Sequence, residues 1–182
     1  MKMRVVVVPG IGGSDEDHWQ SRWEADSVDM VRLEPVSWDA PEFGDWSAAL
    51  DRATGGERVV IVAHSLGCLL AVRWAREHEV AGLFLVAVPD PGGAAFPRVA
   101  ADFGDDLVDP PGAPTLLIAS DDDPYCSPER SAAFARAWQA DLVSVGSHGH
   151  LNSASNLGPW HEGRDLFAGF IAAVSDPQHP ST

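Results

Sequence analysis

The chain has 182 residues, of which 45% are hydrophobic and 21% are charged, and its formal net charge is -15. This length fits one domain with one sizeable core, and the composition is that of a folded globular protein rather than a disordered one. A surface this acidic repels phosphate backbones and anionic lipids, which argues against nucleic-acid and membrane partners.

Apolar runs of strand length alternate with helical stretches along the chain. The expected strands are Arg4–Val8, Met30–Val36, Arg58–Ala63, Leu83–Val88, Thr115–Ala119 and Leu142–Val145. The expected helices are Asp17–Glu24, Phe43–Thr54, Leu66–His78, Pro128–Ala140 and His161–Val174. Runs of β-branched residues without polar alternation are typical of parallel strands that helices cover on both faces. The predicted class is therefore α/β, with a mostly parallel sheet of about six strands.

No internal repeat, low-complexity tract or linker divides the chain, so we expect a single domain over residues 1–175. Residues 176–182 are polar and rich in proline, which predicts a flexible tail. The apolar run Val5–Val8 is too short for a signal sequence or a membrane span. The two cysteines form no disulfide framework, and we therefore expect a cytoplasmic protein.

The most informative stretch lies at the end of the third expected strand. There Ala63, Ser65 and Gly67 form the pattern small-x-Ser-x-Gly directly before a helix, which is the pattern of the nucleophile elbow of α/β-hydrolases. Small flanking residues allow the tight turn that lifts the serine hydroxyl clear of the sheet. The backbone N–H of Leu66, at the helix N-terminus, is an expected donor to a developing oxyanion. Ser65 is the predicted nucleophile; the alternative is a serine that only caps the helix.

A nucleophilic serine needs a general base, and the base needs an acid to orient it. In this fold the acid follows the serine in the chain and the histidine comes last. Asp121, Asp122 and Asp123 follow the fifth expected strand, and we favour Asp123 over Asp122 because the proline after it stiffens the loop. His148 and His150 follow the last strand, and the glycine before His150 favours the latter, since it permits a sharp turn.

A glycine-rich loop follows the first expected strand, and it lacks the full fingerprint of a nucleotide site. In a serine hydrolase this loop supplies the second oxyanion donor, and the N–H of Ile11 is the expected one. His18 and Trp19 are candidates for the pocket wall, although tryptophan is at least as common in a core. His148, His150 and the aspartates lack any recognised zinc spacing, so we expect neither a metal nor another cofactor.

With these residues in place, the sequence resembles the small serine-hydrolase family that includes the YdeN-like bacterial proteins and the retinoblastoma-binding serine hydrolase. The resemblance extends from Val5 to about Phe170. The motifs that carry it are Val8-Pro9-Gly10-x-Gly12, Asp17-His18-Trp19-Gln20-x-Arg22-Trp23, His64-Ser65-Leu66-Gly67-Cys68, Asp122-Asp123-Pro124, Gly149-His150-Leu151-Asn152 and Gly158-Pro159-Trp160-x-Glu162-Gly163. Ala63 departs from the family pattern, because glycine is usual at that position.

The resemblance implies a compact α/β-hydrolase that lacks the first two strands of larger relatives and has no large lid. It also implies Ser65 as the nucleophile, Asp123 as the acid and His150 as the base. The predicted function is hydrolysis of a small ester or amide through an acyl-enzyme, of the carboxylesterase type. The alternative is a binding module on a hydrolase scaffold with weak activity, whose protein partner the sequence does not identify.

Overall fold

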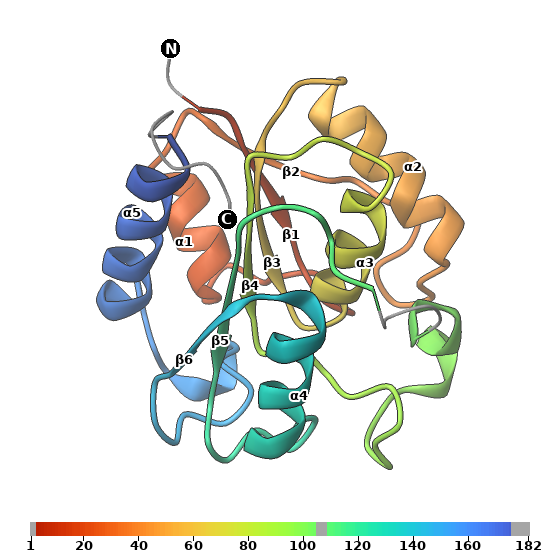
Figure 1. Cartoon of the computed structure of the whole chain (residues 1–182), viewed down its shortest axis with the longest axis vertical. Coiled ribbons are helices and arrows are strands. Elements are labelled where there is room, and N and C mark those ends of the chain that lie inside the picture. The colour runs from red at the N-terminus through yellow and green to blue at the C-terminus, as the bar shows by residue number, and fades with distance from the viewer. Residues whose placement is uncertain (1–2, 105–108, 176–182) are drawn as a thin grey trace.

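One six-stranded sheet runs through the computed structural model, which describes residues 3–104 and 109–175 (Figure 1). Its strands are β1 (Val5–Val8), β2 (Met30–Arg32), β3 (Val60–His64), β4 (Gly82–Val86), β5 (Thr115–Ala119) and β6 (Asp141–Ser144). They lie in the order β2-β1-β3-β4-β5-β6, and every neighbouring pair is parallel. This arrangement confirms the predicted α/β class. The tail predicted over residues 176–182 lies outside the described residues.

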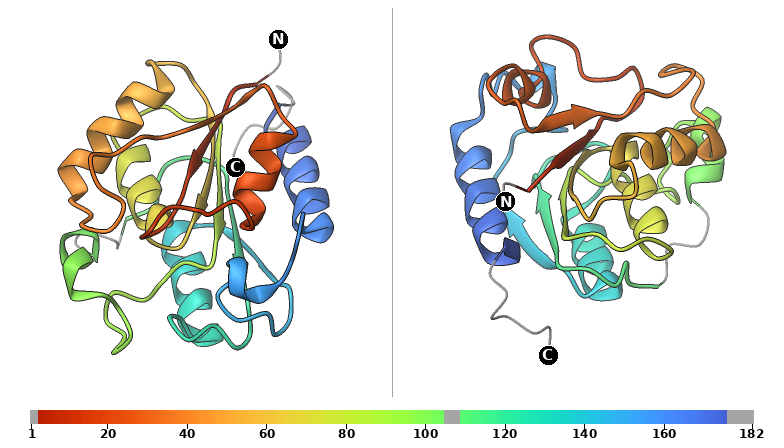
Figure 2. Two further views of the ribbon diagram at one scale, coloured as in Figure 1. Left: turned by 180° about the vertical axis from the view of Figure 1, so that it is seen from behind. Right: turned by 90° about the horizontal axis from the view of Figure 1, so that it is seen from above.

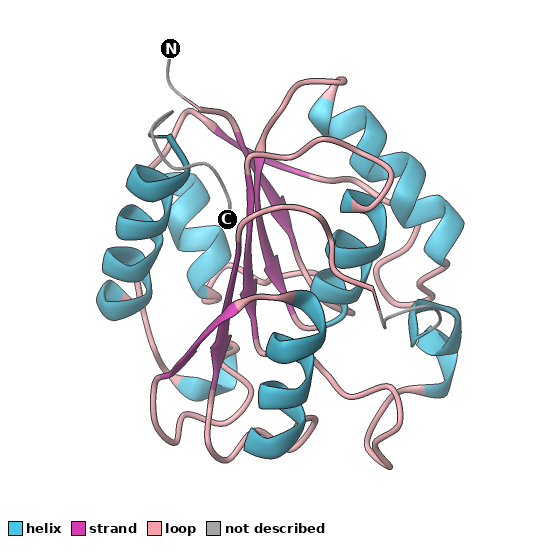
Figure 3. Cartoon of the chain, in the orientation of Figure 1, coloured by secondary structure: helices cyan, strands magenta, loops and turns pink. Residues whose placement is uncertain are grey.

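Helices cover both faces of the sheet, as Figures 2 and 3 show. They are α1 (Trp19–Ala25), α2 (Phe43–Thr54), α3 (Leu66–Ala75), α4 (Pro128–Trp138) and α5 (His161–Ser175). Helices α1 and α5 pack on one face, and α2, α3 and α4 pack on the other (Figure 1). Two short 3₁₀ helices, Arg98–Gly104 and Ser153–Ser155, lie in the connections between these elements. Within residues 3–104 and 109–175, no helix combines the length and the apolar character that a membrane span requires.

The buried strands build two separate cores, one on each face of the sheet. Successive side chains of a strand point to opposite faces, so a continuous apolar strand contributes to both cores. Ile61 and Leu85 belong to the core that α2, α3 and α4 cover. Val62 and Phe84 belong to the other core, where Trp23 of α1 lies. This alternation explains why the central strands carry almost no polar residues.

The second strand is shorter than predicted, because β2 ends at Arg32 and not at Val36. Pro35 has no backbone N–H to donate to a neighbouring strand, which ends the regular pairing. The backbone N–H of Val36 donates instead to the carboxylate of Asp45 in α2, at 2.7 Å. The Val36 side chain is 89% exposed. The sequence pattern was therefore wrong about this end of the strand.

The predicted helix Leu66–His78 also ends early, at Ala75. The ring of His78 stacks on Trp74 with 3.8 Å between the ring centroids. Its Nδ1–H donates to the backbone carbonyl of Trp74 at 2.8 Å, which is the carbonyl that a continued helix would offer to the backbone of residue 78. The ends of the other predicted elements differ from the structure by two residues or fewer.

Candidate active site

Four loops that follow parallel strands meet at one edge of the sheet. Because all strands are parallel, their carboxyl ends lie at the same edge, where ligands bind in open α/β sheets. Ile11 follows β1, Ser65 follows β3, Asp123 follows β5 and His150 follows β6. Residues that are far apart in the sequence are therefore brought together by the topology of the sheet.

The turn between β3 and α3 holds Ser65 in a conformation that few residues other than glycine adopt. Its backbone angles are φ 53 and ψ -125. A Cβ atom at Gly67 would lie 2.4 Å from the carbonyl oxygen of Val8 and 2.5 Å from that of Pro9, so only glycine fits there. A Cβ atom at Gly10 would lie 2.9 Å from the Cβ of Ser65. The turn is thus as tight as the sequence pattern predicts.

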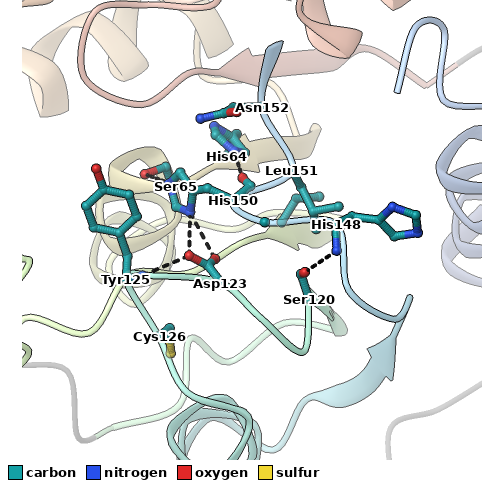
Figure 4. A network of polar contacts seen from close by, with 12 residues as sticks. His64, Ser65, Ser120, Asp123, Tyr125, Cys126, His148, His150, Leu151 and Asn152 are labelled. Atoms are coloured by element: carbon teal, nitrogen blue, oxygen red, sulfur yellow. Dashed lines mark hydrogen bonds and ion pairs between the residues drawn. The ribbon is translucent and has the colours of Figure 1, made fainter. Parts of the chain in front are cut away.

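A continuous chain of hydrogen bonds connects Ser65, His150 and Asp123 (Figure 4). The Oγ of Ser65 lies 2.8 Å from the Nε2 of His150, and the Nδ1 of His150 lies 2.9 Å from both carboxylate oxygens of Asp123. Since the carboxylate can only accept, Nδ1 carries the hydrogen, and Nε2 of the neutral ring accepts from the serine hydroxyl. Asp123 is 9% exposed, and its Oδ1 also accepts from the backbone N–H of Tyr125.

The two other aspartates of the acidic run hold the loop that leads to His150. The Oδ1 of Asp121 accepts from the hydroxyl of Ser144 at 2.6 Å. The Oδ1 of Asp122 accepts from the backbone N–H of Gly149 at 2.7 Å and from the hydroxyl of Ser120 at 2.9 Å. The bond from Gly149, followed by that from Ser120, lowers the pKa of Asp122. Asp121 and Asp122 therefore bind neighbouring loop residues and do not contact the histidine.

The structure also separates the two candidate histidines. The ring of His148 points away from Ser65 into solvent, while the ring of His150 lies against it (Figure 4). The backbone N–H of His148 donates to the hydroxyl of Ser120 at 2.9 Å. His148 thus contributes to the loop through its backbone, and its side chain takes no part in the hydrogen-bond chain.

Two buried side chains hold the successive backbone carbonyls of His150 and Leu151. The Nε2–H of His64 donates to the carbonyl of His150 at 2.9 Å, and the Nε1–H of Trp19 donates to the carbonyl of Leu151 at 2.8 Å. Leu151 is fully buried and has φ 50, a strained angle for leucine. Burial lowers the pKa of His64 well below its ordinary value, so this ring stays neutral. Both donors therefore stabilise a backbone turn that positions the His150 ring.

Trp19, one of the two candidates for the pocket wall, lies in the core and is not among the residues that line the cavity. Its side chain is 1% exposed and packs in the core between Trp23 and Trp160, with ring centroids 4.6 Å and 5.1 Å away. Helix α1 faces the sheet, and at position 19 this buries the large ring completely. The sequence left the pocket wall and the core both open for Trp19, because the periodicity of a short helix does not show which end of its buried face reaches the cavity.

A cavity of about 630 Å³ opens over Ser65. Its lining includes His18, the other candidate for the pocket wall, and Ile11 and Leu66, the two expected oxyanion donors. The wall formed by residues 89–99, after β4, was not identified from the sequence because this segment contains no motif. Tyr125 was missed as well, although its position two residues after Asp123 could have indicated it. In the described ranges, no group of His, Cys, Asp and Glu side chains could hold a metal ion.

His18 makes the stability of the fold sensitive to acid. The side chain is 4% exposed, and burial lowers its pKa from 6.5 to about 4. In the unfolded chain the imidazole is protonated below about pH 6.5, whereas in the folded chain it is protonated only below about pH 4. The free energy of unfolding therefore has its full value above pH 6.5 and decreases as the pH is lowered from 6.5 to 4. At 1.36 kcal/mol per unit, we expect the free energy of unfolding to fall by about 2 to 3 kcal/mol between pH 7.5 and 4.5 from this group.

Urea unfolding at a series of pH values measures this loss. His18→Asn is a suitable comparison, because an asparagine oxygen can replace Nδ1 as the acceptor for the backbone N–H of Gln20. The variant should lose less stability than the original chain over the same pH range. Burial of His64 contributes in the same direction in both proteins, so some loss remains. Equal losses in the two proteins would contradict the assignment to His18.

The parallel sheet, the strained serine after β3 and the loops that converge on it define an α/β-hydrolase. The chain matches the serine hydrolase family over residues 5–169, and it belongs to that family. This membership confirms the resemblance that the sequence motifs indicated. No curated protein sequence matches the chain.

Solved structures agree with this assignment. A YdeN-like hydrolase from Pectobacterium atrosepticum is 32% identical, with a TM-score of 0.85 over 95% of this chain and 92% of that one. The ydeN gene product of B. subtilis is 21% identical, with a TM-score of 0.79 over 94% of this chain and all of the other. The esterase domain of a Rhodothermus marinus protein is 18% identical, with a TM-score of 0.70 over 93% and 87% of the two chains, and it shares the fold.

Proposed function

We propose that this serine hydrolase cleaves small carboxylic esters, of the carboxylesterase type, through an acyl-enzyme intermediate. The hydrogen-bond chain Ser65–His150–Asp123 is the observation that carries the proposal, because it links a hydroxyl to a general base and the base to a buried carboxylate. In this mechanism His150 takes the proton of Ser65 as its oxygen attacks the ester carbonyl. His150 then gives that proton to the departing alcohol. A water molecule, activated by the same ring, releases the acyl group.

The backbone N–H groups of Ile11 and Leu66 are the proposed oxyanion donors. Both residues line the cavity beside Ser65. Within the described part of the chain, neither N–H donates a backbone hydrogen bond. Leu66 is the first residue of α3, where the helix dipole places partial positive charge next to the serine. Such donors stabilise the tetrahedral intermediate, since its oxygen carries more negative charge than the ester carbonyl.

A small ester or amide suits the dimensions of the site. The cavity of about 630 Å³ is large enough for a compact molecule and lies in the range typical of small-molecule sites. The proposed mechanism requires only side chains, backbone N–H groups and water, so it involves no cofactor. The Rhodothermus marinus domain is an esterase by description, which is compatible with ester cleavage on this fold.

A fluorophosphonate probe tests the proposal, because it reacts only with an activated serine. We expect the native protein to be labelled at Ser65, with the position established by mass spectrometry of the digested adduct, and the Ser65→Ala variant to remain unlabelled. The folded state of both proteins is checked by circular dichroism. A folded native protein that fails to react would overturn the proposal and favour a binding module on this scaffold.

A further inference from the structure

The cavity over Ser65 has two chemically different walls. An apolar wall comes from the segment after β4 and includes Phe96, Pro97 and Val99. A polar wall comes from the loop after β1 and from the chain that follows His150, and its members are Asp15, His18, Asn152 and Ser153. Ser65 lies in the same cavity as both walls. An ester bound at this serine therefore meets different surroundings at its two ends.

Asp15 lines the cavity, and one of its two carboxylate oxygens has no hydrogen-bond partner among the described residues. Its Oδ1 accepts three hydrogen bonds, from the hydroxyl of Ser153 at 2.6 Å and from the backbone N–H groups of Asp17 and His18 at 3.0 Å. Its Oδ2 accepts none from the described residues, and no ion pair of Asp15 occurs among them. The hydrogen bond from Ser153 lowers the pKa of Asp15, so the carboxylate is ionised at neutral pH. The polar wall thus contains a fixed negative charge.

His18 supplies a second polar group in the same wall. Its Nδ1 accepts from the backbone N–H of Gln20, so the hydrogen of the neutral ring is on Nε2. This buried Nε2–H has no hydrogen-bond partner among the described residues, although the side chain is 4% exposed and lines the cavity. A buried donor without a partner is costly, and because the Nε2 atom is itself covered, a ligand oxygen would reach it only if the side chains around it moved.

The proposed reaction determines which end of the ester faces the polar wall. The departing alcohol must lie next to His150, because it receives its proton from Nε2 of that ring. Asn152 and Ser153 come two and three positions after His150 in the chain, and Ser153 is hydrogen-bonded to Asp15. The alcohol therefore lies toward the polar wall. The acyl group extends the other way, toward Phe96 and Val99.

We propose that the site selects esters with a short apolar acyl group and an alcohol that carries a positive charge, which Asp15 binds through Oδ2. This inference rests on the proposed function and specifies its substrate class. The exposed position of Asp15 means that water and salt weaken the attraction. Even so, a charge pair about 5 Å apart at the mouth of a cavity is expected to favour the cationic ester about fivefold to tenfold in kcat/KM.

Matched esters that differ only in charge test the proposal. One pair consists of butyrylcholine and 3,3-dimethylbutyl butyrate, which replaces the ammonium nitrogen by carbon. A second pair has two more methylene groups in the alcohol, which allows for a longer reach to Asp15. We expect the cationic ester of at least one pair to have the higher kcat/KM in the native protein. The ratio of kcat/KM for the cationic ester to that for the neutral ester should approach one in Asp15→Asn, which retains an Oδ1 acceptor. It should also approach one in the native protein at high ionic strength.

Glu16→Gln is the matched control for the overall acidic surface. It removes the same charge from the neighbouring position, and Glu16 does not line the cavity. The cationic preference should persist in this variant. Two results would overturn the inference. One is a native kcat/KM ratio of cationic to neutral ester near one in both pairs, and the other is an equal decrease of this ratio in Asp15→Asn and Glu16→Gln. Labelling of Ser65 and hydrolysis of phenyl butyrate, followed separately, show whether the proposed function itself has failed.

Discussion

Replacing His150 by alanine is expected to lower kcat for phenyl butyrate by on the order of 10⁵-fold. The reason is that the ring at Nε2 is the only base within hydrogen-bond distance of the Ser65 hydroxyl in the described part of the chain, at 2.8 Å. Without it, the hydroxyl keeps its proton at neutral pH and is a weak nucleophile. Steady-state and single-turnover rates of ester hydrolysis measure the effect.

His148→Ala is the control, since it removes a histidine from the same loop. The ring of His148 is exposed and points away from Ser65, and its backbone bond to Ser120 is unaffected by the substitution (Figure 4). We expect its rate to stay within about twofold of the native rate. If His148→Ala were as inactive as His150→Ala, or if His150→Ala retained activity, the assigned base would be wrong.

Gly67→Ala is expected to destabilise the fold by at least about 3 kcal/mol, or to prevent folding. An added Cβ would meet the backbone carbonyl oxygens of Val8 and Pro9 at 2.4 Å and 2.5 Å, and backbone cannot rotate away as a side chain can. Either β1 must move or α3 must tilt. Because β1 is an inner strand of the sheet and α3 packs on its face, either change would disturb the core. Urea unfolding, followed by tryptophan fluorescence, measures the loss.

Gly169→Ala is a matched control within a helix. This glycine lies in α5, and an added Cβ would have no neighbour within 4 Å. Alanine favours a helix over glycine, so the variant should gain about 0.5 to 1 kcal/mol of stability. A Gly67→Ala protein as stable as the native one would contradict the close approach of position 67 to the carbonyl oxygens of Val8 and Pro9.

Features that depend on neighbouring residues were predicted correctly from the sequence. The alternation of strands and helices follows from apolar runs and turn residues a few positions apart, and it was enough to predict the parallel sheet. The tight turn at Ser65 was predicted from small residues within five positions, although the atoms that exclude a larger side chain at Gly67 are the carbonyl oxygens of Val8 and Pro9 at the end of β1. The motifs were also specific enough to indicate the serine hydrolase family.

Features that depend on distant residues were decided only by the tertiary structure. Asp123 and Asp122 are chemically identical neighbours, and only the folded loop shows that the first contacts His150 and the second binds Gly149. The Nε1–H of Trp19 bonds to Leu151, 132 positions away, and no local pattern predicts such a contact. The role of a side chain in a site depends on the residues that contact it. Those residues become neighbours only when the folded sheet brings the loops after its strands together at one edge.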